Sequence, residues 1–70
     1  MRMYVPARDD VLEEEVILEV VDGELERVID PDEFEPDPFS AVANVLQGCV
    51  FKAGPYRYEA VGERAWTRRA

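Results

Sequence analysis

The chain has no histidine, one cysteine (Cys49) and one lysine (Lys52) in its 70 residues. The absence of histidine removes the usual general base and the commonest metal ligand of proteins. A single cysteine excludes a disulfide within the chain, and with no histidine to activate it we expect Cys49 to be a buried, unreactive thiol. Nothing in the flanking sequence marks Lys52 as an amine nucleophile. We therefore expect no catalytic residues and no enzymatic activity.

A metal site is not expected either, although the chain has 16 Asp and Glu residues. Asp30 and Asp32 have the spacing of the first two ligands of a calcium loop. However, Phe34 occupies the position of the third ligand, and Glu35 occupies the position where the loop needs glycine. We therefore expect no bound metal and no cofactor.

Long hydrophobic runs are also missing. No segment approaches the roughly 20 apolar residues of a membrane span, and the first residues lack the apolar stretch of a signal peptide. We expect a cytoplasmic or virion-associated protein that is not secreted through a signal peptide and does not enter a membrane. The length predicts one domain, 1–70. So small a domain buries only about 60% of its unfolded surface, so we expect an oligomer or part of a larger assembly.

Charge is distributed unequally along the chain. Residues 1–37 carry 14 Asp and Glu against 3 Arg, a net charge of −11, whereas residues 38–70 carry 2 Glu against 5 Lys and Arg, a net charge of +3. Unlike charges in the two halves predict a molecule with one acidic and one basic surface. Complementary surfaces of this kind set the register of protein assembly. Adaptation to the host is an alternative reason for the excess of acid.

The strongest local pattern is a β-hairpin over residues 15–29. Two segments rich in β-branched residues, 16–21 and 24–29, flank Asp22-Gly23, which tolerates the positive φ angles of a two-residue turn. The turn predicts four opposing pairs: Val20 with Leu25, Val16 with Ile29, Leu18 with Arg27, and Glu19 with Glu26. The last two pairs are unfavourable, because one sets an apolar residue against a cation and the other sets like charges opposite each other.

Two further elements are considered in the first third of the chain. A helix over residues 11–21, capped by Asp9 or Asp10, competes with the hairpin, but its β-branched residues disfavour it. Residues Tyr4 and Val5 are predicted to form an edge strand that Pro6 ends. An exposed strand edge of this kind invites pairing with another subunit.

A turn-rich acidic connector, residues 30–37, follows the hairpin. Asp30 is predicted to cap a single helical turn that starts at Pro31, and Phe34 is predicted to anchor the connector. A helix should then begin with Asp37 as its N-cap and end at Gly48. Pro38 is the first residue of this predicted helix. One face of the helix carries Phe39, Val42, Ala43 and Leu46.

The last third of the chain reads as a short β-meander. Its predicted strands are 49–53, 56–61 and 64–68, separated by the Gly54-Pro55 turn and a break at Gly62. The order of elements predicts an α+β fold, in which one helix packs on a small antiparallel sheet or partly open barrel made of the N-terminal hairpin and the C-terminal meander. The predicted core residues are Phe39, Val42, Leu46, Val16, Leu18, Val20 and Leu25.

Aromatic and basic residues alternate in the meander, in the way of a strand that stacks nucleic-acid bases. Tyr56 and Tyr58 fall on one face and Arg57 on the other, so the rings fit a core equally well. The −11 half opposes phosphate binding. Direct binding of nucleic acid is therefore not expected.

We expect two partner-binding surfaces. The acidic surface comprises Asp30, Asp32, Glu33, Glu35, Asp37, Glu24 and Glu26. The basic and aromatic surface comprises Arg57, Arg64, Trp66, Arg68 and Arg69. These surfaces are typical of a non-catalytic protein–protein assembly subunit, such as a decoration, connector or tail accessory protein of a phage or archaeal virus. The alternative is an acidic mimic of nucleic acid that inhibits a host defence or DNA-binding protein, as anti-restriction and anti-CRISPR proteins do.

Overall fold

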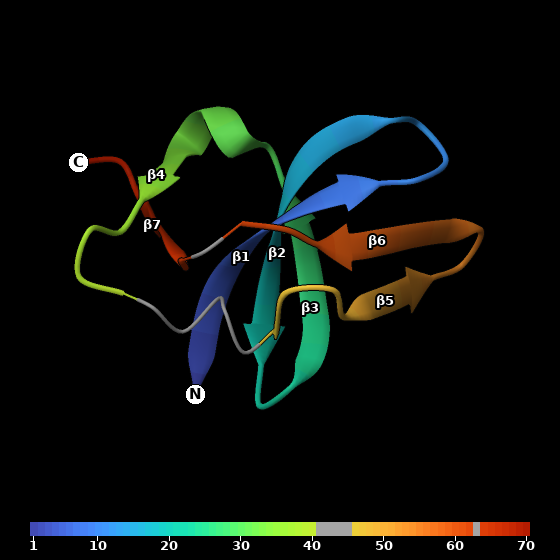
Figure 1. Cartoon of the computed structure of the whole chain (residues 1–70), viewed down its shortest axis with the longest axis horizontal. Coiled ribbons are helices and arrows are strands. Elements are labelled where there is room, and N and C mark those ends of the chain that lie inside the picture. Colours follow the sequence, from blue (N-terminus) through green and yellow to red (C-terminus); the bar gives the residue numbers. More distant parts are fainter. Residues whose placement is uncertain (41–45, 63) are drawn as a thin grey trace.

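The computed structural model of the protein describes residues 1–40, 46–62 and 64–70. In chain order its elements are β1 (Arg2–Asp9), β2 (Glu14–Val21), β3 (Glu24–Ile29), the 3-10 turn η1 (Pro31–Glu33), β4 (Phe34–Pro36), β5 (Val50–Ala53), β6 (Tyr56–Ala60) and β7 (Trp66–Arg68). These strands form one curled antiparallel sheet, a half-barrel (Figure 1). The described residues therefore make an all-β fold.

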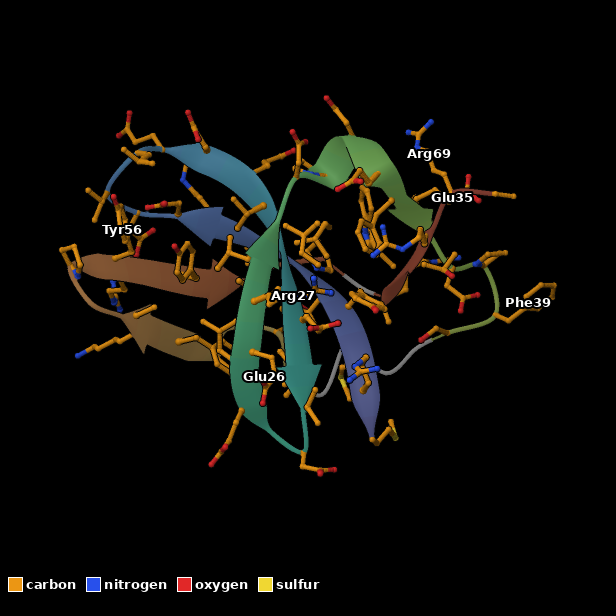
Figure 2. All side chains as sticks on the ribbon, turned by 180° about the vertical axis from the view of Figure 1, so that it is seen from behind. Glu26, Arg27, Glu35, Phe39, Tyr56 and Arg69 are labelled. Carbon is orange, nitrogen blue, oxygen red and sulfur yellow. The ribbon has the colours of Figure 1, made fainter. Side chains whose placement is uncertain are left out.

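The predicted sheet is confirmed, but the predicted helix is not. Residues 37–40, where the helix should begin, form a turn in which the Asp37 Oδ1 accepts a hydrogen bond from the Phe39 N–H at 3.0 Å. The Asp37 N–H donates to the Ala65 carbonyl at 3.0 Å, which ties this turn to the chain before β7. As a result Phe39 projects into solvent, 96% exposed (Figure 2), and its assignment to the core is wrong.

The remaining helix positions are only partly described. Val42 and Ala43 lie outside the described residues. Leu46 is half-buried and packs against the core, as predicted. Leu46 is the one residue in 1–40, 46–62 and 64–70 with α-helical conformation, and none of these residues belongs to a helix long and apolar enough to cross a membrane.

The β2–β3 hairpin is confirmed, with one change of register. Asp22 and Gly23 have φ angles of 52° and 85°, as the two-residue turn requires. Val20 pairs with Leu25 as predicted, but beyond it a β-bulge at Glu26 advances β3 by one residue. The pairs beyond the bulge are Glu19 with Arg27, Leu18 with Val28, and Ile17 with Ile29. The bulge thus replaces both unfavourable predicted pairs, and the predicted pairing of Val16 with Ile29 is wrong.

Strand β1 lies in the middle of the sheet, so the predicted edge strand at Tyr4 and Val5 is wrong. One side of β1 pairs with β2 from Arg2 to Asp9. Its other side pairs first with β7, through Tyr4 and Trp66, and then with β6 from Ala7 onward. Pro6 lies between the part of β1 that pairs with β7 and the part that pairs with β6. The N–H that proline lacks therefore interrupts no continuous strand ladder on this side of β1. The Pro6 carbonyl still accepts from the Val61 N–H at 2.9 Å.

The two outermost strands of the described sheet order are β3 and β5. Strand β3 contains the bulge at Glu26, and β5 is four residues long and contains Lys52. Bulges, short length and lysine all oppose pairing at a strand edge. Association through strand edges stays a prediction.

One face of the β1–β2 pair, here called the inner face, forms the main core. Its buried members, with side chains from β6, are Val5, Ala7, Leu18, Val20, Tyr58 and Ala60. Met3, Val16, Leu25 and Phe51 pack at the margin of this cluster. The predicted Leu18 and Val20 are thus confirmed as core, and the core reading of Tyr58 is confirmed as well. Burial raises the pKa of the Tyr58 phenol, with smaller contributions from Asp9 and Tyr56.

The opposite face, here called the outer face, is covered by a ribbon of β4 and β7. Phe34 of β4 is completely buried and lies 4.8 Å from the Tyr4 ring of β1, measured between ring centroids. The guanidinium of Arg68 in β7 lies over the Phe34 ring, with its Cζ 4.9 Å from the ring centroid. The predicted role of Phe34 as an anchor is confirmed.

Asp9 and Cys49 also differ from the predictions. The competing helix over residues 11–21 does not form, because residues 14–21 are strand β2. Asp9 instead caps the β1–β2 turn, where its Oδ1 accepts from the N–H groups of Val11 and Leu12 at 2.8 and 3.1 Å. Cys49 is exposed rather than buried. It precedes β5, where its backbone bonds to Leu46 and Ala60 fix the chain and leave the thiol outside the core.

Candidate protein-binding surface

The acidic connector and the Arg-rich end of the chain lie next to each other. Connector residues 34–36 form β4, which pairs with β7, so that Phe34 opposes Arg68 and Glu35 opposes Thr67. The Arg68 Nη1 lies 3.8 Å from the Glu33 Oε1. Arg69 donates through its Nε to the Phe34 carbonyl at 3.0 Å. Glu35 and Arg69 are seen close together in Figure 2. Acidic residues of the first half of the sequence and arginines of the second half therefore lie next to each other along the β4–β7 ribbon.

The other predicted basic and aromatic residues lie in different places. Arg57 of β6 donates to the Asp10 Oδ2 at 2.9 Å, across the turn between β1 and β2. Arg64 is exposed and has no partner among the described residues. Trp66 is half-buried in β7. The structure therefore brings Trp66, Arg68 and Arg69 together, while Arg57 lies on another strand pair.

Six carboxylates follow one margin of the molecule, here called the acidic rim. Its members are Glu14, Glu15, Asp30, Asp32, Glu33 and Glu35. They lie at the start of β2, around η1 and in β4, which succeed one another along the upper margin of Figure 1. Glu14, Glu15 and Asp30 line one shallow depression of about 420 Å³. All six residues are exposed to solvent.

The acidic rim has few internal partners. Asp30 accepts from the Asp32 N–H at 2.9 Å as the cap of η1, which confirms the predicted cap, and Glu33 has its distant contact with Arg68. The side chains of Glu14, Glu15, Asp32 and Glu35 make no hydrogen bond or ion pair with the described residues. Their negative charge is therefore available to a partner.

Three predicted acidic residues lie outside the rim. Glu24 and Glu26 lie on β3 toward the hairpin turn, and Figure 2 shows Glu26 far from Glu35. Asp37 is half-buried after β4, where its side chain bonds to the Phe39 N–H. The predicted acidic surface is thus divided into the rim and a separate hairpin group.

Glu19 was predicted to oppose Glu26, and the sequence did not indicate that it is buried and ion-paired. It lies on the outer face, only 5% exposed. Its Oε1 accepts from the Arg27 Nε at 2.9 Å, and its Oε2 accepts from the Arg27 Nη2 at 3.2 Å and the Tyr4 hydroxyl at 3.1 Å. The Arg2 Nε lies 3.5 Å from the same Oε2. The hydrogen bond from Arg27 lowers the pKa of Glu19, and burial acts in the opposite direction. Glu19 is therefore a structural ion-pair residue.

An apolar hollow of about 220 Å³ lies beside the rim. Pro6 and Ile17 of the β1–β2 pair, Val61 after β6, Pro31 of η1 and Trp66 of β7 contribute to its walls. Glu15 is the one charged residue that lines it. The sequence gives no signal for this hollow, because its walls come from segments far apart in the chain.

No group of three or more Cys, Asp or Glu side chains in the described ranges is arranged to hold a metal ion. The features that remain as candidates for contact with a partner are the acidic rim and the hollow. Comparison of the chain with protein-family models, with curated proteins and with solved structures gave no match.

Proposed function

We propose that the chain is a non-catalytic protein-binding subunit that holds a basic surface of a partner protein against its acidic rim. The observation that carries this proposal is the contrast between cations and carboxylates. Arg2, Arg27, Arg57 and Arg68 all lie in ion pairs within the molecule. Four carboxylates of the rim have no such partner. Negative charge therefore predominates on this margin, although Arg8 stands opposite Glu15 and Arg69 bonds to the Phe34 carbonyl.

An excess of negative charge on a margin favours a positively charged partner. Exposed ion pairs contribute only about 0.2–1 kcal/mol each, so the rim supports binding through several pairs at once. Its larger effect is on the association rate and on the choice of partner. Such contact requires no catalytic group, which agrees with the absence of histidine.

Two kinds of basic protein surface fit the rim. One belongs to a scaffold such as the virion of a phage or archaeal virus, in which the chain would be an accessory subunit. The other is the nucleic-acid-binding groove of a host protein, which the rim would fill as a mimic. Arg68 and Arg69 next to Glu33 and Glu35 interrupt the row of carboxylates. Because a mimic needs an uninterrupted row, this interruption favours the scaffold.

The proposal is tested by titrating the isotope-labelled protein with a peptide of alternating Arg and Ser, followed by NMR. We expect shifts at the backbone amides of β2, η1 and β4. The affinity should fall as salt is raised from about 20 to about 300 mM, because the screening length shortens from tens of ångströms to below 10 Å. A peptide with Gln in place of Arg should not bind.

Matched variants separate the rim from total charge. The double variant Asp32→Lys, Glu35→Lys should lose binding, because both side chains are exposed and have no partner. The double variant Glu24→Lys, Glu26→Lys changes the net charge by the same amount, but on the hairpin. This variant should retain most of the peptide binding. Glu33 is left unchanged because it contacts Arg68. Equal losses in the two variants, or no loss in either, would show that the rim is not the contact.

A further inference from the structure

The hollow beside the rim is built from backbone-paired segments. The Val61 N–H donates to the Pro6 carbonyl at 2.9 Å, which brings the chain after β6 across β1. Gly62 follows with φ +91°, and a Cβ at this position would lie 3.1 Å from the Pro6 Cγ. Trp66 is held by pairing of β7 with both Tyr4 and Pro36. Each of these walls is fixed by strand pairing or a backbone hydrogen bond.

The chemistry of the hollow changes from its walls to its surroundings. Its lining is apolar apart from Glu15. Glu15, Val16 and Pro31 also line the neighbouring depression, to which Glu14 and Asp30 add two more carboxylates. No Arg or Lys lines either space. An apolar space therefore adjoins three carboxylates, and Arg8, which stands opposite Glu15 in the strand ladder, lines neither space.

We infer that this hollow receives the side chain of one Arg or Lys from the basic partner, and so anchors that partner on the acidic rim. The inference rests on the proposed function and adds the residue type that is recognised. Arg and Lys have an apolar stem and a charged head, so the stem matches the walls and the head matches the carboxylates of Glu14, Glu15 and Asp30. The indole of Trp66 favours a cation near its face.

The size of the hollow agrees with a single side chain. At about 220 Å³ it is smaller than the roughly 300–1,000 Å³ of pockets that hold small organic ligands. A neutral aliphatic side chain would fill the apolar part but would leave the three carboxylates without a partner. A short carboxylate-bearing side chain would be repelled by them. The charge at the opening therefore selects the basic residues.

Trp66 is the only tryptophan of the chain, so its fluorescence reports directly on the hollow. The probe is the blocked tripeptide acetyl-Ser-Arg-Ser-amide, compared with the same peptide carrying norleucine in place of arginine. We expect a saturable change of Trp66 fluorescence with the arginine peptide in the millimolar range. The norleucine peptide should bind at least about fivefold more weakly, which corresponds to the loss of one charge pair.

Two variants and one control test the residues. Glu15→Gln should weaken binding of the arginine peptide by about fivefold. Glu24→Gln removes the same charge on the hairpin and should leave binding unchanged. Val61→Phe should fill the hollow and abolish the response. If Val61→Phe proves unfolded by circular dichroism, Glu15→Gln and the norleucine peptide still decide the question.

The outcomes distinguish this inference from the proposed function. If the variant Asp32→Lys, Glu35→Lys loses the repeat peptide of Arg and Ser but keeps the Trp66 response, both proposals hold. If the repeat peptide binds at the rim while the tripeptide gives no saturable response, only the hollow inference fails. Equal affinity for arginine and norleucine would also overturn it. A Trp66 change that depends on protein concentration without any peptide would show that a second copy occupies the hollow.

Discussion

The inner and outer faces of the β1–β2 pair are both buried, but by different means. The inner face presents Val5, Leu18 and Val20, and Tyr58 and Ala60 of the same curled sheet pack in one cluster with them. The outer face is covered by the separate β4–β7 ribbon, which buries Phe34. The same face also carries the ion-paired Glu19 and the hollow beside Trp66.

This difference shows how a chain of 70 residues divides its limited apolar material. A small domain has too little apolar surface to form two complete cores. The inner face receives the continuous cluster, and the outer face is completed by a buried carboxylate with its hydrogen bonds. The incomplete packing of the outer face leaves the space next to the acidic rim. The candidate binding surface is thus a consequence of how the second face is covered.

Removal of the ring that anchors the ribbon should break this arrangement most strongly. Phe34→Ala should lower the free energy of unfolding by about 3–5 kcal/mol, because Phe34 is completely buried. A domain of this size has only about 4–10 kcal/mol in total. Phe39→Ala is the matched control: at 96% exposure its effect should stay within about 0.5 kcal/mol. Urea denaturation measures both, and similar losses would mean that Phe39 packs in solution.

A methyl group at Gly62 should have the next largest effect. Gly62→Ala places an L-residue at φ +91° and brings its Cβ within 3.1 Å of the Pro6 Cγ. The backbone conformation alone costs about 1–2 kcal/mol. Gly23→Ala, at φ +85° with nothing within 4 Å, carries the same kind of strain without the contact. The difference between their urea midpoints isolates the approach to Pro6, and a difference of zero would show that this wall of the hollow yields freely.

The smallest of the three effects is expected from Glu19→Gln, which removes the charge of the ion pair but keeps one oxygen that accepts a hydrogen bond from Arg27 or Tyr4. The difference from the original protein should be present at neutral pH and should shrink in acid, where Glu19 becomes protonated and also loses its charge. The pKa of Glu19 in the folded protein lies below its ordinary value of 4.5, so its stabilising contribution is complete above that value. This contribution is lost as pH falls through the folded pKa.

Urea midpoints measured from pH 7 to pH 3 test this expectation. The original protein should lose more stability in acid than Glu19→Gln does. Glu26→Gln provides the control, since Glu26 is an exposed neighbour without a partner, and it should keep the original pH dependence. A parallel decline of the original protein and Glu19→Gln would show that the ion pair contributes nothing to folding.

Local patterns in the sequence predicted the elements whose contacts are short in range. Asp22-Gly23 specified the hairpin turn, Asp30 specified the cap of η1, and Gly54-Pro55 specified the turn between β5 and β6. In each case the residues that determine the conformation are within the element itself. The third strand of the meander was also found, but it pairs with β1 and β4 instead of β6.

The missed features depend on residues far apart in the chain. Pro6 was predicted to end a strand, but β1 continues through it. Strand β7 pairs with β1 before Pro6, and β6 pairs with β1 after it. Pairing of β4 with β7 decided the position of the acidic residues relative to the arginines, and no local pattern reports it. The mismatched pairs of the predicted hairpin were the one signal of the bulge at Glu26, since only a register shift brings Arg27 opposite Glu19.

The bulge at Glu26 also determines where the length of this protein can change. In a regular strand, loss of one residue moves all later side chains to the opposite face of the sheet. Glu26 is the supernumerary residue of its strand, so its deletion would leave Leu25 opposite Val20 and Arg27 opposite Glu19. Glu26 is therefore a position at which one residue can be deleted while every cross-strand pair of the hairpin is kept.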